Sequence, residues 1–386
     1  MLALTNPYLR RKRYKLTDKE EEKFEWGITT LAGAKPSVIR RLGKDHNVDL
    51  SYRKRWRNSK LIAYIINFLG IFDRISFSFK KKHHPKKAPI FIIGHWRSGT
   101  TLMHNLICDI TDSSYCSTYQ NIFPNNLFAF YGLLRGAIQR KMPDTRPADG
   151  VKMHTLYPQE EEFALGNMFY HSFYYWMFFP NDTEQIARRF LLQTELSASE
   201  KDAWLKNYKL FVTRTSTKRG GEQFISKNPP NTTRVKEILS IYPDAKFIFL
   251  HRNIYDTLSS THRFYKGVLP AQQHQHLKDE VLMVQILDVY SLLHDKYIAD
   301  RQLVPEGNLV ELSFSEFQLD PLNRLTEILD RFGTNYELSE EVVKKYTRSE
   351  HKTKEYKHDD EYVSKVNQRL GKYFEVFGYE MIKNEK

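Results

Sequence analysis

The sequence predicts an α/β fold with three layers, in which helices flank a central sheet of parallel strands. The first observation is an apolar run at residues 89–93, which is followed by a glycine-containing loop and a helical pattern. The second is a strand, helix, strand, helix order that begins at residue 223, with a further strand at 308–314. Strands that alternate with helices pair in parallel through right-handed crossovers. We therefore expect one α/β domain over residues 88–386.

The first predicted strand is wholly apolar. Residues 89–93 read Pro-Ile-Phe-Ile-Ile, which suits a central parallel strand that is buried on both faces. A loop follows from Gly94 to Gly99, and the next apolar positions form one helical stripe: Leu102, Met103, Leu106, Ile107 and Ile110. This order of strand, glycine loop and helix is typical of half of a phosphate-binding unit.

A second unit follows later in the chain. Residues 223–227 (Gln-Phe-Ile-Ser-Lys) indicate a strand, which the proline pair at 229–230 ends. The apolar spacing over 232–242 predicts a helix, and residues 246–250 (Lys-Phe-Ile-Phe-Leu) predict the next strand. We expect another helix from Asn253. Because a helix connects the two strands, they should lie parallel in the sheet.

The last predicted strand, at 308–314, precedes a helix with clear end signals. Asp320 is a suitable N-cap, Pro321 stands at the first helical position, and Gly333 follows the last turn. Such residues are favoured at these places by backbone geometry. We therefore expect a helix between Asp320 and Gly333.

Residues 1–87 are basic and carry a helical pattern, including a charged stretch at 18–26, so we expect a helical N-terminal extension. The Lys- and His-rich run at 80–87 is interpreted as a solvated linker, with an anion-binding or membrane-surface patch as the alternative. The longest apolar run, residues 61–72, is interrupted by Asn67 and is shorter than the roughly 20 residues that span a membrane. We expect it to be a buried core helix. Basic residues flank it, so membrane docking is the alternative: Arg55, Arg57, Lys60 and Arg74.

Composition excludes several classes of protein. At 41% hydrophobic and 27% charged residues the chain can build a full core, so it is not a disordered protein. Its two cysteines, Cys108 and Cys116, exclude a disulfide framework and a four-thiolate zinc site, and we expect both to stay reduced. No secretion signal is recognised, so a cytoplasmic location is expected. The net charge of +13 favours an anionic partner, but no nucleic-acid motif accompanies it, and we expect no nucleic-acid partner.

Three of the predicted strands end in groups that suit a polyanion. In open parallel sheets, ligands bind beyond the carboxyl ends of the strands. The first predicted strand ends at Gly94 and its loop, the second at Lys227, and the third at Arg252. We expect these three places to meet at one edge of the sheet.

The first loop, Gly94-x4-Gly99-Thr100-Thr101, resembles the P-loop of nucleotide triphosphatases with one change. Thr100 stands where those proteins carry the lysine that reaches the phosphates, and the basic residue of the loop is Arg97. No predicted strand ends in an Asp that could hold magnesium. The loop can still bind a phosphate through its backbone N–H groups and the helix N-terminus. It therefore predicts phosphate binding that requires no metal.

A second phosphate site is indicated by Arg252 and Ser260. The Arg follows a strand, and the Ser lies eight residues later in the next helix, so a guanidinium and a hydroxyl could share one phosphate. The alternative is that Arg252 pairs with an acidic neighbour and that Ser260 is an ordinary helix residue.

Together these motifs resemble those of sulfotransferases that use 3′-phosphoadenosine 5′-phosphosulfate (PAPS). Residues 94–103 (Gly-His-Trp-Arg-Ser-Gly-Thr-Thr-Leu-Met) resemble the 5′-phosphosulfate loop, in the arginine-bearing form of the tyrosylprotein and bacterial enzymes. Arg252 and Ser260 match the family's 3′-phosphate residues at the same spacing. Residues 309–321 resemble its strand, Glu, Asp-Pro, helix element, and residues 348–356 resemble the basic loop that closes over the cofactor. The resemblance implies the sulfotransferase fold for residues 88–386.

The resemblance also implies roles for single residues. Lys227 would reach the bridging oxygen, and Arg97 would serve both binding and catalysis. The 3′-phosphate would be held by Arg252 and Ser260 together with Arg348 or Lys352. The 5′-phosphate and sulfate would lie on His95, Trp96, Arg97, Ser98, Gly99, Thr100 and Thr101. No metal is required by this arrangement.

The sequence departs from the cytosolic small-molecule enzymes of this family. Those enzymes carry Lys in the first loop, where this chain has Arg97, and their catalytic His follows the second strand, where this chain reads Lys227-Asn-Pro-Pro230. The general base must therefore come from another segment.

The best candidate for the base is the acidic run Glu160-Glu161-Glu162, which resembles a Pro-x-Glu-Asp-Glu stretch of bacterial members. Pro158 would open a helix and place these carboxylates in its first turn, where Glu is also common for reasons of the helix dipole alone. We favour Glu160 or Glu161. The rivals for the role are His95 and His104, and then His154 and His171.

The acceptor is indicated least clearly. Residues 168–180 contain eight aromatic side chains, which are interpreted as core, with an apolar pocket for a sterol or other lipid alcohol as the alternative. We expect sulfuryl transfer to the hydroxyl of such a small apolar molecule by in-line displacement, with a Glu or His base. A carbohydrate acceptor remains open because sugars also stack on aromatic rings. Besides burial or membrane docking, the apolar run at 61–72 could cover the acceptor site. The alternative of another class is a P-loop kinase or triphosphatase.

Overall fold

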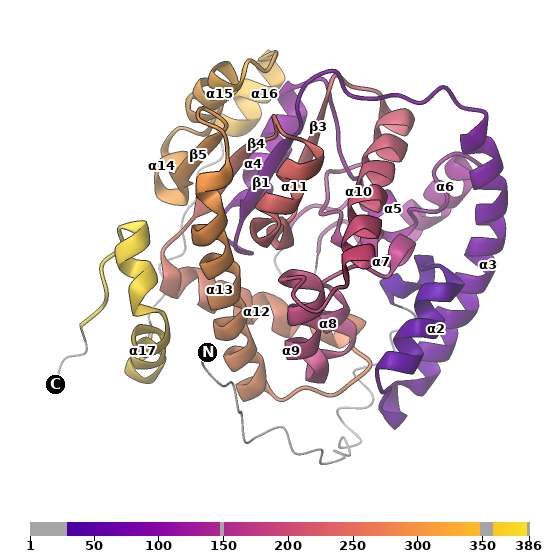
Figure 1. Cartoon of the computed structure of the whole chain (residues 1–386), viewed down its shortest axis with the longest axis horizontal. Coiled ribbons are helices and arrows are strands. Elements are labelled where there is room, and N and C mark those ends of the chain that lie inside the picture. The colour runs from indigo at the N-terminus through magenta and orange to yellow at the C-terminus, as the bar shows by residue number, and fades with distance from the viewer. Residues whose placement is uncertain (1–28, 147–149, 348–357, 384–386) are drawn as a thin grey trace.

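The computed structural model describes residues 29–146, 150–347 and 358–383. The charged stretch at 18–26 and the two basic residues Arg348 and Lys352 lie outside this described part of the chain. In Figure 1 the helices at residues 36–45 and 53–78 lie on one side of the sheet. The last helix, at residues 360–377, lies on the other side.

The sheet has five parallel strands in the order β2-β3-β1-β4-β5. Their bounds are β1 Ile90–Gly94, β2 Ser113–Ser114, β3 Gln223–Lys227, β4 Lys246–His251 and β5 Leu309–Ser313. The register places Ile92 beside Lys227 of β3 and Gly94 beside Leu250 of β4, so β1 lies at the centre. This confirms the predicted parallel sheet and the convergence of three strand ends. The two-residue edge strand β2 was not predicted, because it is too short to show any periodicity.

Helices make up the other layers. The bounds up to the second unit are α2 Pro36–Asp45, α3 Arg53–Ser78, α4 Thr100–Ile110, α5 Thr118–Ile122, α6 Tyr131–Lys141, α7 Glu162–Phe169, α8 Tyr175–Phe178, α9 Thr183–Ile186 and α10 Ala198–Arg219. The remaining α-helices are α11 Val235–Ile241, α12 Ile254–Gln272, α13 Asp279–Asp300, α14 Phe314–Leu319, α15 Pro321–Phe332, α16 Glu340–Thr347 and α17 Asp360–Phe377. Short 3-10 turns are Thr30–Gly33, Leu50–Tyr52, Pro180–Asp182, Pro229–Thr233 and Arg301–Leu303, and Ala187–Leu191 is a π-helical turn.

Both faces of the sheet are buried, as the apolar strands predict. From β1, Ile90 and Ile92 pack with α4 and α15 on one face, and Phe91 and Ile93 pack with α10 and α11 on the other. A strand with two buried faces has no polar alternation, which is why the run at 89–93 is continuously apolar.

The residues that were predicted to begin and end α15 do so in the structure. The Asp320 carboxylate accepts a hydrogen bond from the Asn323 N–H at 3.3 Å, Pro321 begins the helix, and Gly333 ends it in the left-handed conformation at φ 63°. Asn253 likewise caps α12 by accepting from the Asp256 N–H at 3.3 Å. Because α12 begins just after β4, it holds the residues that follow this strand at the edge of the sheet.

The described part of the N-terminal region shares a core with the rest of the molecule. Leu31, Ile39 and Leu42 belong to the same buried cluster as Tyr170 and Phe190. Helices α2 and α3 lie at the edge of the molecule away from β5 (Figure 1). The division of the chain at residues 87 and 88 stays a prediction.

Helix α3 contradicts the expected burial of residues 61–72. Leu61, Ile65 and Phe68 are 62%, 55% and 63% exposed, whereas the buried side of the helix carries small or polar residues such as Ala63 and Gly70. A side chain at Gly70 would meet the Asn125 carbonyl oxygen at 3.3 Å, so the helix packs through its small residues. The apolar run was expected to be inside because apolar residues usually are, and here they face outward. Among the described residues, one stretch, Leu50–Ser78, is long and apolar enough to cross a membrane by length and composition.

Candidate active site

The loop between β1 and α4 depends on its two glycines. Gly94 and Gly99 have φ values of 133° and 95°, and Arg97 between them also has a positive φ of 68°. A Cβ on Gly99 would lie 2.1 Å from the Phe314 ring, and one on Gly94 would lie 2.2 Å from the Leu250 carbonyl oxygen. The loop therefore packs closely against β4 and α14 while it turns into α4. The Leu102 N–H donates to the Gly99 carbonyl at 3.0 Å, and the two N–H groups before it, at Thr100 and Thr101, stand at a helix start, a place that favours anions.

Thr232 holds the start of the loop. Its hydroxyl accepts a hydrogen bond from the Gly94 N–H at 2.8 Å and donates one to the Gly94 carbonyl at 3.2 Å. Within the loop, the Ser98 hydroxyl donates to the His95 carbonyl at 2.7 Å. Sequence analysis did not single out Thr232, since a hydroxyl in a predicted helix start carries no distinctive pattern. Thr232 lies in the turn Pro229–Thr233, which follows β3. Its hydrogen bonds therefore connect the end of β3 to the loop.

The structure brings Arg97 and Ser260 together. The Arg97 Nε donates to the Ser260 hydroxyl at 3.1 Å, and its guanidinium lies 5.3 Å from the centre of the Phe264 ring. Ser260 is in α12, which begins just after β4. The two predicted phosphate sites thus share one hydrogen bond and belong to a single surface.

Arg252 stands at the end of β4 on the same edge. Its guanidinium lies 5.3 Å from the Phe314 ring centre, and its Nη2 is 3.5 Å from an oxygen of Asp256. The other Asp256 oxygen lies 3.2 Å from Nε2 of His358. The acidic partner that sequence analysis offered as the alternative is therefore present. Because Arg252 is partly exposed and the contact is long, this pairing leaves the guanidinium able to contact an anion as well.

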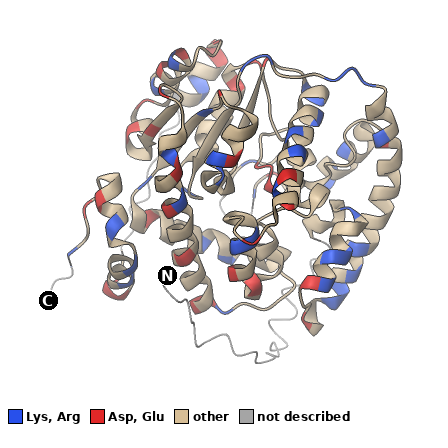
Figure 2. Ribbon diagram, in the orientation of Figure 1, with Lys and Arg blue, Asp and Glu red and all other residues tan. Residues whose placement is uncertain are grey.

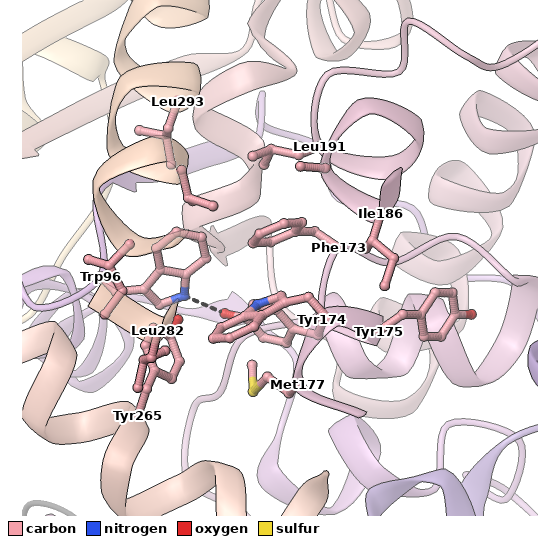
Figure 3. Packing of buried hydrophobic residues seen from close by; sticks show 14 of the residues in the cluster. Trp96, Phe173, Tyr174, Tyr175, Met177, Ile186, Leu191, Tyr265, Leu282 and Leu293 are labelled. Carbon is pink, nitrogen blue, oxygen red and sulfur yellow. Dashed lines mark hydrogen bonds between the residues drawn. The ribbon is translucent and has the colours of Figure 1, made fainter. Parts of the chain in front are cut away.

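Lys227 ends β3 beside the loop and forms an ion pair with Glu160. The Lys227 Nζ is 2.5 Å from a carboxylate oxygen of Glu160, and the lysine side chain is only 3% exposed. The other Glu160 oxygen accepts a hydrogen bond from the Tyr174 hydroxyl. Tyr174 in turn accepts from the Trp96 indole N–H at 2.8 Å, as Figure 3 shows. A continuous polar chain thus runs from Lys227 through Glu160 and Tyr174 to Trp96, in the loop between β1 and α4.

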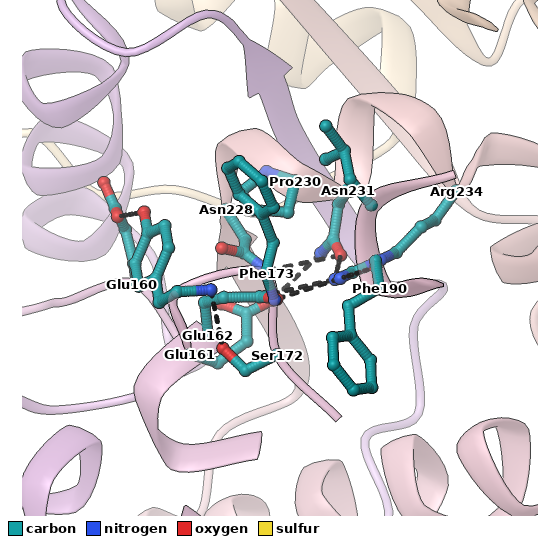
Figure 4. A network of polar contacts seen from close by, with 12 residues as sticks. Glu160, Glu161, Glu162, Ser172, Phe173, Phe190, Asn228, Pro230, Asn231 and Arg234 are labelled. Atoms are coloured by element: carbon teal, nitrogen blue, oxygen red, sulfur yellow. Dashed lines mark hydrogen bonds and ion pairs between the residues drawn. The ribbon is translucent and has the colours of Figure 1, made fainter. Parts of the chain in front are cut away.

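The other two glutamates are enclosed elsewhere. Glu161 is buried and accepts hydrogen bonds from Ser226 and Tyr208, and burial raises the pKa of its carboxyl while these two hydroxyls oppose the rise. Burial also acts to raise the pKa of Glu162, but the Arg234 guanidinium, which binds it through two hydrogen bonds of 2.8 and 2.9 Å, keeps it below its usual value. Figure 4 shows Glu160 at one side of this cluster, apart from the Glu162–Arg234 contacts.

The helix that carries these glutamates begins later than expected. It starts at Glu162 instead of near Pro158. Pro158 pairs with Ser117 in an antiparallel bridge, and the Gln159 N–H donates to the Cys116 carbonyl at 2.8 Å. This pairing keeps the segment extended. Glu160 is therefore outside the helix, where it reaches Lys227.

Three of the histidines proposed as rival bases, His95, His104 and His171, are buried and uncharged near neutral pH. Burial lowers the pKa of His95 to about 4, although its hydrogen bond with the Trp96 carbonyl at 2.8 Å acts in the opposite direction. Burial lowers the pKa of His104 far below its usual value, and the nearby Lys227 charge adds to this. Neither ring nitrogen of His104 has a hydrogen-bond partner among the described residues. His171 is buried in the same way, with a pKa of about 4, and His154 lies in the loop before Glu160.

A narrow apolar cavity of about 10 Å³, room for about one water molecule, adjoins the loop at Trp96. Aromatic and aliphatic side chains from α8, α12 and α13 close it. Figure 3 labels three of its lining residues, Trp96, Phe173 and Tyr265. Its lining residues are His95, Trp96, Phe173, Trp176, Thr183, Thr261, Tyr265, Gln285, Ile286 and Val289. The indole N–H of Trp176 and the hydroxyl of Tyr265 are buried and have no hydrogen-bond partner within the described chain. The aromatic run at 168–180 is thus mostly core, as interpreted, and two of its rings also form the pocket wall.

The electrostatics around the pocket link it to the ion pair. Burial raises the pKa of the Tyr265 hydroxyl well above its usual value, the Glu160 carboxylate adds to the rise, and Arg97 opposes it. Burial and Glu160 act on Tyr174 in the same sense. Both phenols therefore stay protonated and can only donate toward a carboxylate. Within the described residues, no group of three His, Cys, Asp or Glu side chains could hold a metal ion.

Several known proteins resemble this chain. The model of a family described as "Sulfotransferase family" matches residues 89–338. Two relatives, from Mycobacterium bovis and Mycobacterium tuberculosis, both carry the name omega-hydroxy-beta-dihydromenaquinone-9 sulfotransferase Stf3. Each is 25% identical over 363 residues, which is 92% of this chain and 92% of the relative.

Solved structures agree at the level of the fold. Sulfotransferase STF9 from Mycobacterium avium superposes with a TM-score of 0.60 at 18% identity, over 84% of this chain and 83% of that one. Sulfotransferase STF1 from Mycobacterium tuberculosis H37Rv gives a TM-score of 0.60 at 16% identity, over 94% of this chain and all of that one. Since the family model spans well over half of its residues, the chain belongs to the sulfotransferase family and is a sulfotransferase enzyme.

Proposed function

We propose that this enzyme transfers the sulfuryl group of PAPS to the hydroxyl of an apolar, lipid-like alcohol, with Glu160 as the general base. The observation that carries the proposal is the position of Glu160. Its carboxylate pairs with Lys227 at a strand end, and through Tyr174 it connects to Trp96, which belongs both to the phosphate loop and to the apolar pocket.

The residues present fit PAPS, which carries two separate anionic groups. The N-terminus of α4 and Arg97 offer donors for the 5′-phosphosulfate, and Arg252 with Ser260 offers a cation and a hydroxyl for the 3′-phosphate. Lys227 lies at the end of β3, beside β1 and its loop, and it also contacts the proposed base Glu160. PAPS, when bound, supplies the sulfuryl group and a phosphate leaving group. The cationic side chains of three adjacent strand ends neutralise the charge of such a molecule.

The contact between Lys227 and Glu160 couples two tasks. Glu160 takes the proton of the acceptor hydroxyl. The hydrogen bonds through Tyr174 connect this carboxylate to Trp96. Once protonated, its carboxyl no longer attracts the Lys227 ammonium, which is then available to the charge that builds on the leaving phosphate. Tyr174 keeps the Glu160 carboxylate oriented because its hydroxyl donates to one oxygen. Proton removal and charge neutralisation are thus joined in one pair of side chains.

The wall of this cavity favours an apolar acceptor over a carbohydrate, and its side chains must move apart before either could enter. Most of its wall is ring and aliphatic surface, and a sugar would need many more hydrogen-bond partners than this wall offers. The exposed surface of the cavity is wholly apolar, so the unpartnered Trp176 indole N–H and Tyr265 hydroxyl do not open onto it. The relatives named as menaquinone-type sulfotransferases act on a hydroxylated menaquinone by name. A hydroxylated prenylquinone is therefore the acceptor class that we propose to test first.

The cofactor is tested by titration calorimetry with 3′,5′-adenosine bisphosphate in metal-free buffer. We expect wild type to bind it, and Arg252→Ala to bind about ten-fold to a hundred-fold more weakly, because a charged hydrogen-bond partner of the phosphate is lost. Arg324→Ala on α15, whose only described ion-pair partner is the exposed Glu327, is the matched control and should bind as wild type does. Absence of binding to folded wild type would contradict PAPS as the donor.

The acceptor is tested separately with labelled PAPS. A hydroxylated prenylquinone, a sterol and a simple sugar are compared as acceptors at equal concentration. We expect turnover with the apolar alcohols and none with the sugar. Turnover of the sugar alone would favour the carbohydrate alternative, while the cofactor result would stand.

A further inference from the structure

Helix α3 presents its large apolar side chains to the outside of the molecule. On its exposed side they follow a helical spacing, so that they form a continuous stripe. Helix α6 widens the stripe, since the Phe130 ring at its start lies 5.8 Å from the ring of Phe72, centre to centre. We call this surface the apolar face, and its members are Leu61, Tyr64, Ile65, Phe68, Ile71, Phe72, Ile75, Phe79, Phe130 and Leu133.

The opposite side of α3 is fixed to the protein along its whole length. Near its start, the Ser59 hydroxyl accepts a hydrogen bond from the Thr29 N–H at 2.9 Å. In its middle, Asn67 donates to the Ala34 carbonyl at 2.7 Å. Near its end, the fully buried Asp73 pairs with Arg214 of α10 at 2.5 Å.

These contacts decide how α3 can meet a membrane. Its length and composition would allow it to cross a bilayer, but crossing would expose the buried Asp73–Arg214 ion pair and the polar groups at Ser59 to hydrocarbon. A helix that keeps these contacts can only lie flat, with its outer side toward the lipid.

Basic side chains stand at both ends of the apolar face. The exposed group before it is Arg53, Lys54, Arg57 and Lys60, and the exposed group at its other end is Arg74, Lys80 and Lys81. Figure 2 shows blue at the start of α3 and a long uncharged stretch beyond it. Between Arg53 and Lys82 the sequence has one acidic residue, Asp73, and its charge is already paired inside the protein.

This arrangement of charge selects the partner. In a symmetric pair of chains joined through the apolar face, parallel or antiparallel helices would both bring basic ends against basic ends. An anionic lipid surface instead supplies negative headgroups around an apolar interior. We propose that the apolar face docks on an anionic lipid bilayer, with its rings and aliphatic groups in the acyl boundary and its lysines and arginines at the headgroups.

Co-sedimentation of the full-length protein with lipid vesicles tests this inference. One vesicle contains phosphatidylglycerol and phosphatidylcholine, and the other contains phosphatidylcholine alone. We expect wild type to pellet with the anionic vesicle, less so at high salt, and only weakly with the neutral one. The double variant Ile65→Gln with Phe68→Gln should lower the partition coefficient at least ten-fold.

The matched control changes two exposed leucines outside the apolar face, Leu303→Gln with Leu319→Gln, and should bind vesicles as wild type does. Thermal melting and binding of 3′,5′-adenosine bisphosphate show whether each variant is folded. Failure of wild type to pellet with anionic vesicles would overturn the inference. So would a wild-type dimer in lipid-free sedimentation equilibrium that the Ile65/Phe68 variant abolishes. Neither readout depends on which alcohol is sulfated.

Discussion

At the scale of single residues, three consecutive carboxylates have different environments, which separate the proposed base Glu160 from its two neighbours. Glu162 is neutralised by Arg234, and Glu161 is enclosed by hydroxyl groups. Glu160, which is 18% exposed, alone meets Lys227 and the polar chain to the loop. A buried carboxylate without access to a substrate cannot serve as its base, whatever its pKa. Glu160 differs from its two neighbours because the extended backbone at Pro158 turns its side chain toward β3.

This division predicts the behaviour of two isosteric substitutions. Glu160→Gln should lower kcat at least about a hundred-fold, because an amide cannot accept the proton, while binding of 3′,5′-adenosine bisphosphate stays within about three-fold. Glu161→Gln is the matched control. Its amide oxygen can still accept from Ser226 and Tyr208, so kcat should change little. Steady-state kinetics with the acceptor that proves active in the labelled-PAPS assay check both, and equal losses in the two variants would remove Glu160 from the proposed role.

Part of this site was open to prediction from the sequence. Arg97, Lys227 and Arg252 follow apolar strands, and a parallel sheet brings such strand ends to one edge. Glu160 came only from the family resemblance, since 67 residues separate it from Lys227 and no spacing rule links them. Tyr174 was hidden within an aromatic run, where nothing in the pattern separates a phenol that contacts a carboxylate from one that only packs.

At the scale of secondary-structure elements, regular strands and capped helices were predictable and irregular segments were not. The strands β1, β3, β4 and β5 and the ends of α15 agree with their patterns. The predicted start of α7 was wrong because Pro158 pairs with Ser117, which is distant in sequence. This pairing keeps the backbone at Pro158 extended. Helix α3 was expected inside because its run is apolar, yet Gly70 and Ala63 determine which side packs. Periodicity locates a helix, but tertiary contacts decide which of its faces is buried.

The loop before α4 supports a prediction about backbone geometry. Gly99→Ala should destabilise the fold by roughly 2–4 kcal/mol, because a Cβ at positive φ is strained and because it would overlap the Phe314 ring. Gly132→Ala in α6 is the matched control, since an added Cβ there would meet no described atom within 4 Å beyond its chain neighbours and its own helix backbone. There the gain in helix propensity should stabilise by up to about 1 kcal/mol. Urea unfolding measures both, and a Gly99→Ala variant as stable as wild type would contradict the close packing of the loop.

At the scale of the whole molecule, buried histidines from distant segments share one effect on stability. Burial lowers the pKa of His95 and His171 to about 4 and that of His274 to about 3, where Arg55 adds to the effect of burial. The unfolded chain keeps values near 6.5. The unfolded state therefore binds protons first as the pH falls, and folding free energy is lost between pH 6.5 and about 4. Glu161 acts in the opposite sense, because its raised pKa favours the folded state in acid.

His274 allows this effect to be isolated. Both of its ring nitrogens lack partners within the described residues, and its ring packs against Trp56 at 5.2 Å, centre to centre. Since its folded pKa lies well below 5, it should contribute about 2 kcal/mol to the loss of stability between pH 7.5 and 5.0. His274→Gln, which cannot take up a proton, should shrink that loss by about the same amount, whatever its effect on packing at pH 7.5. Urea unfolding at the two pH values gives the difference directly. If wild type and variant lose equal stability, the His274 ring takes up its proton as readily in the folded state as in the unfolded one, and the acid sensitivity must come from other buried groups such as His95 and His171.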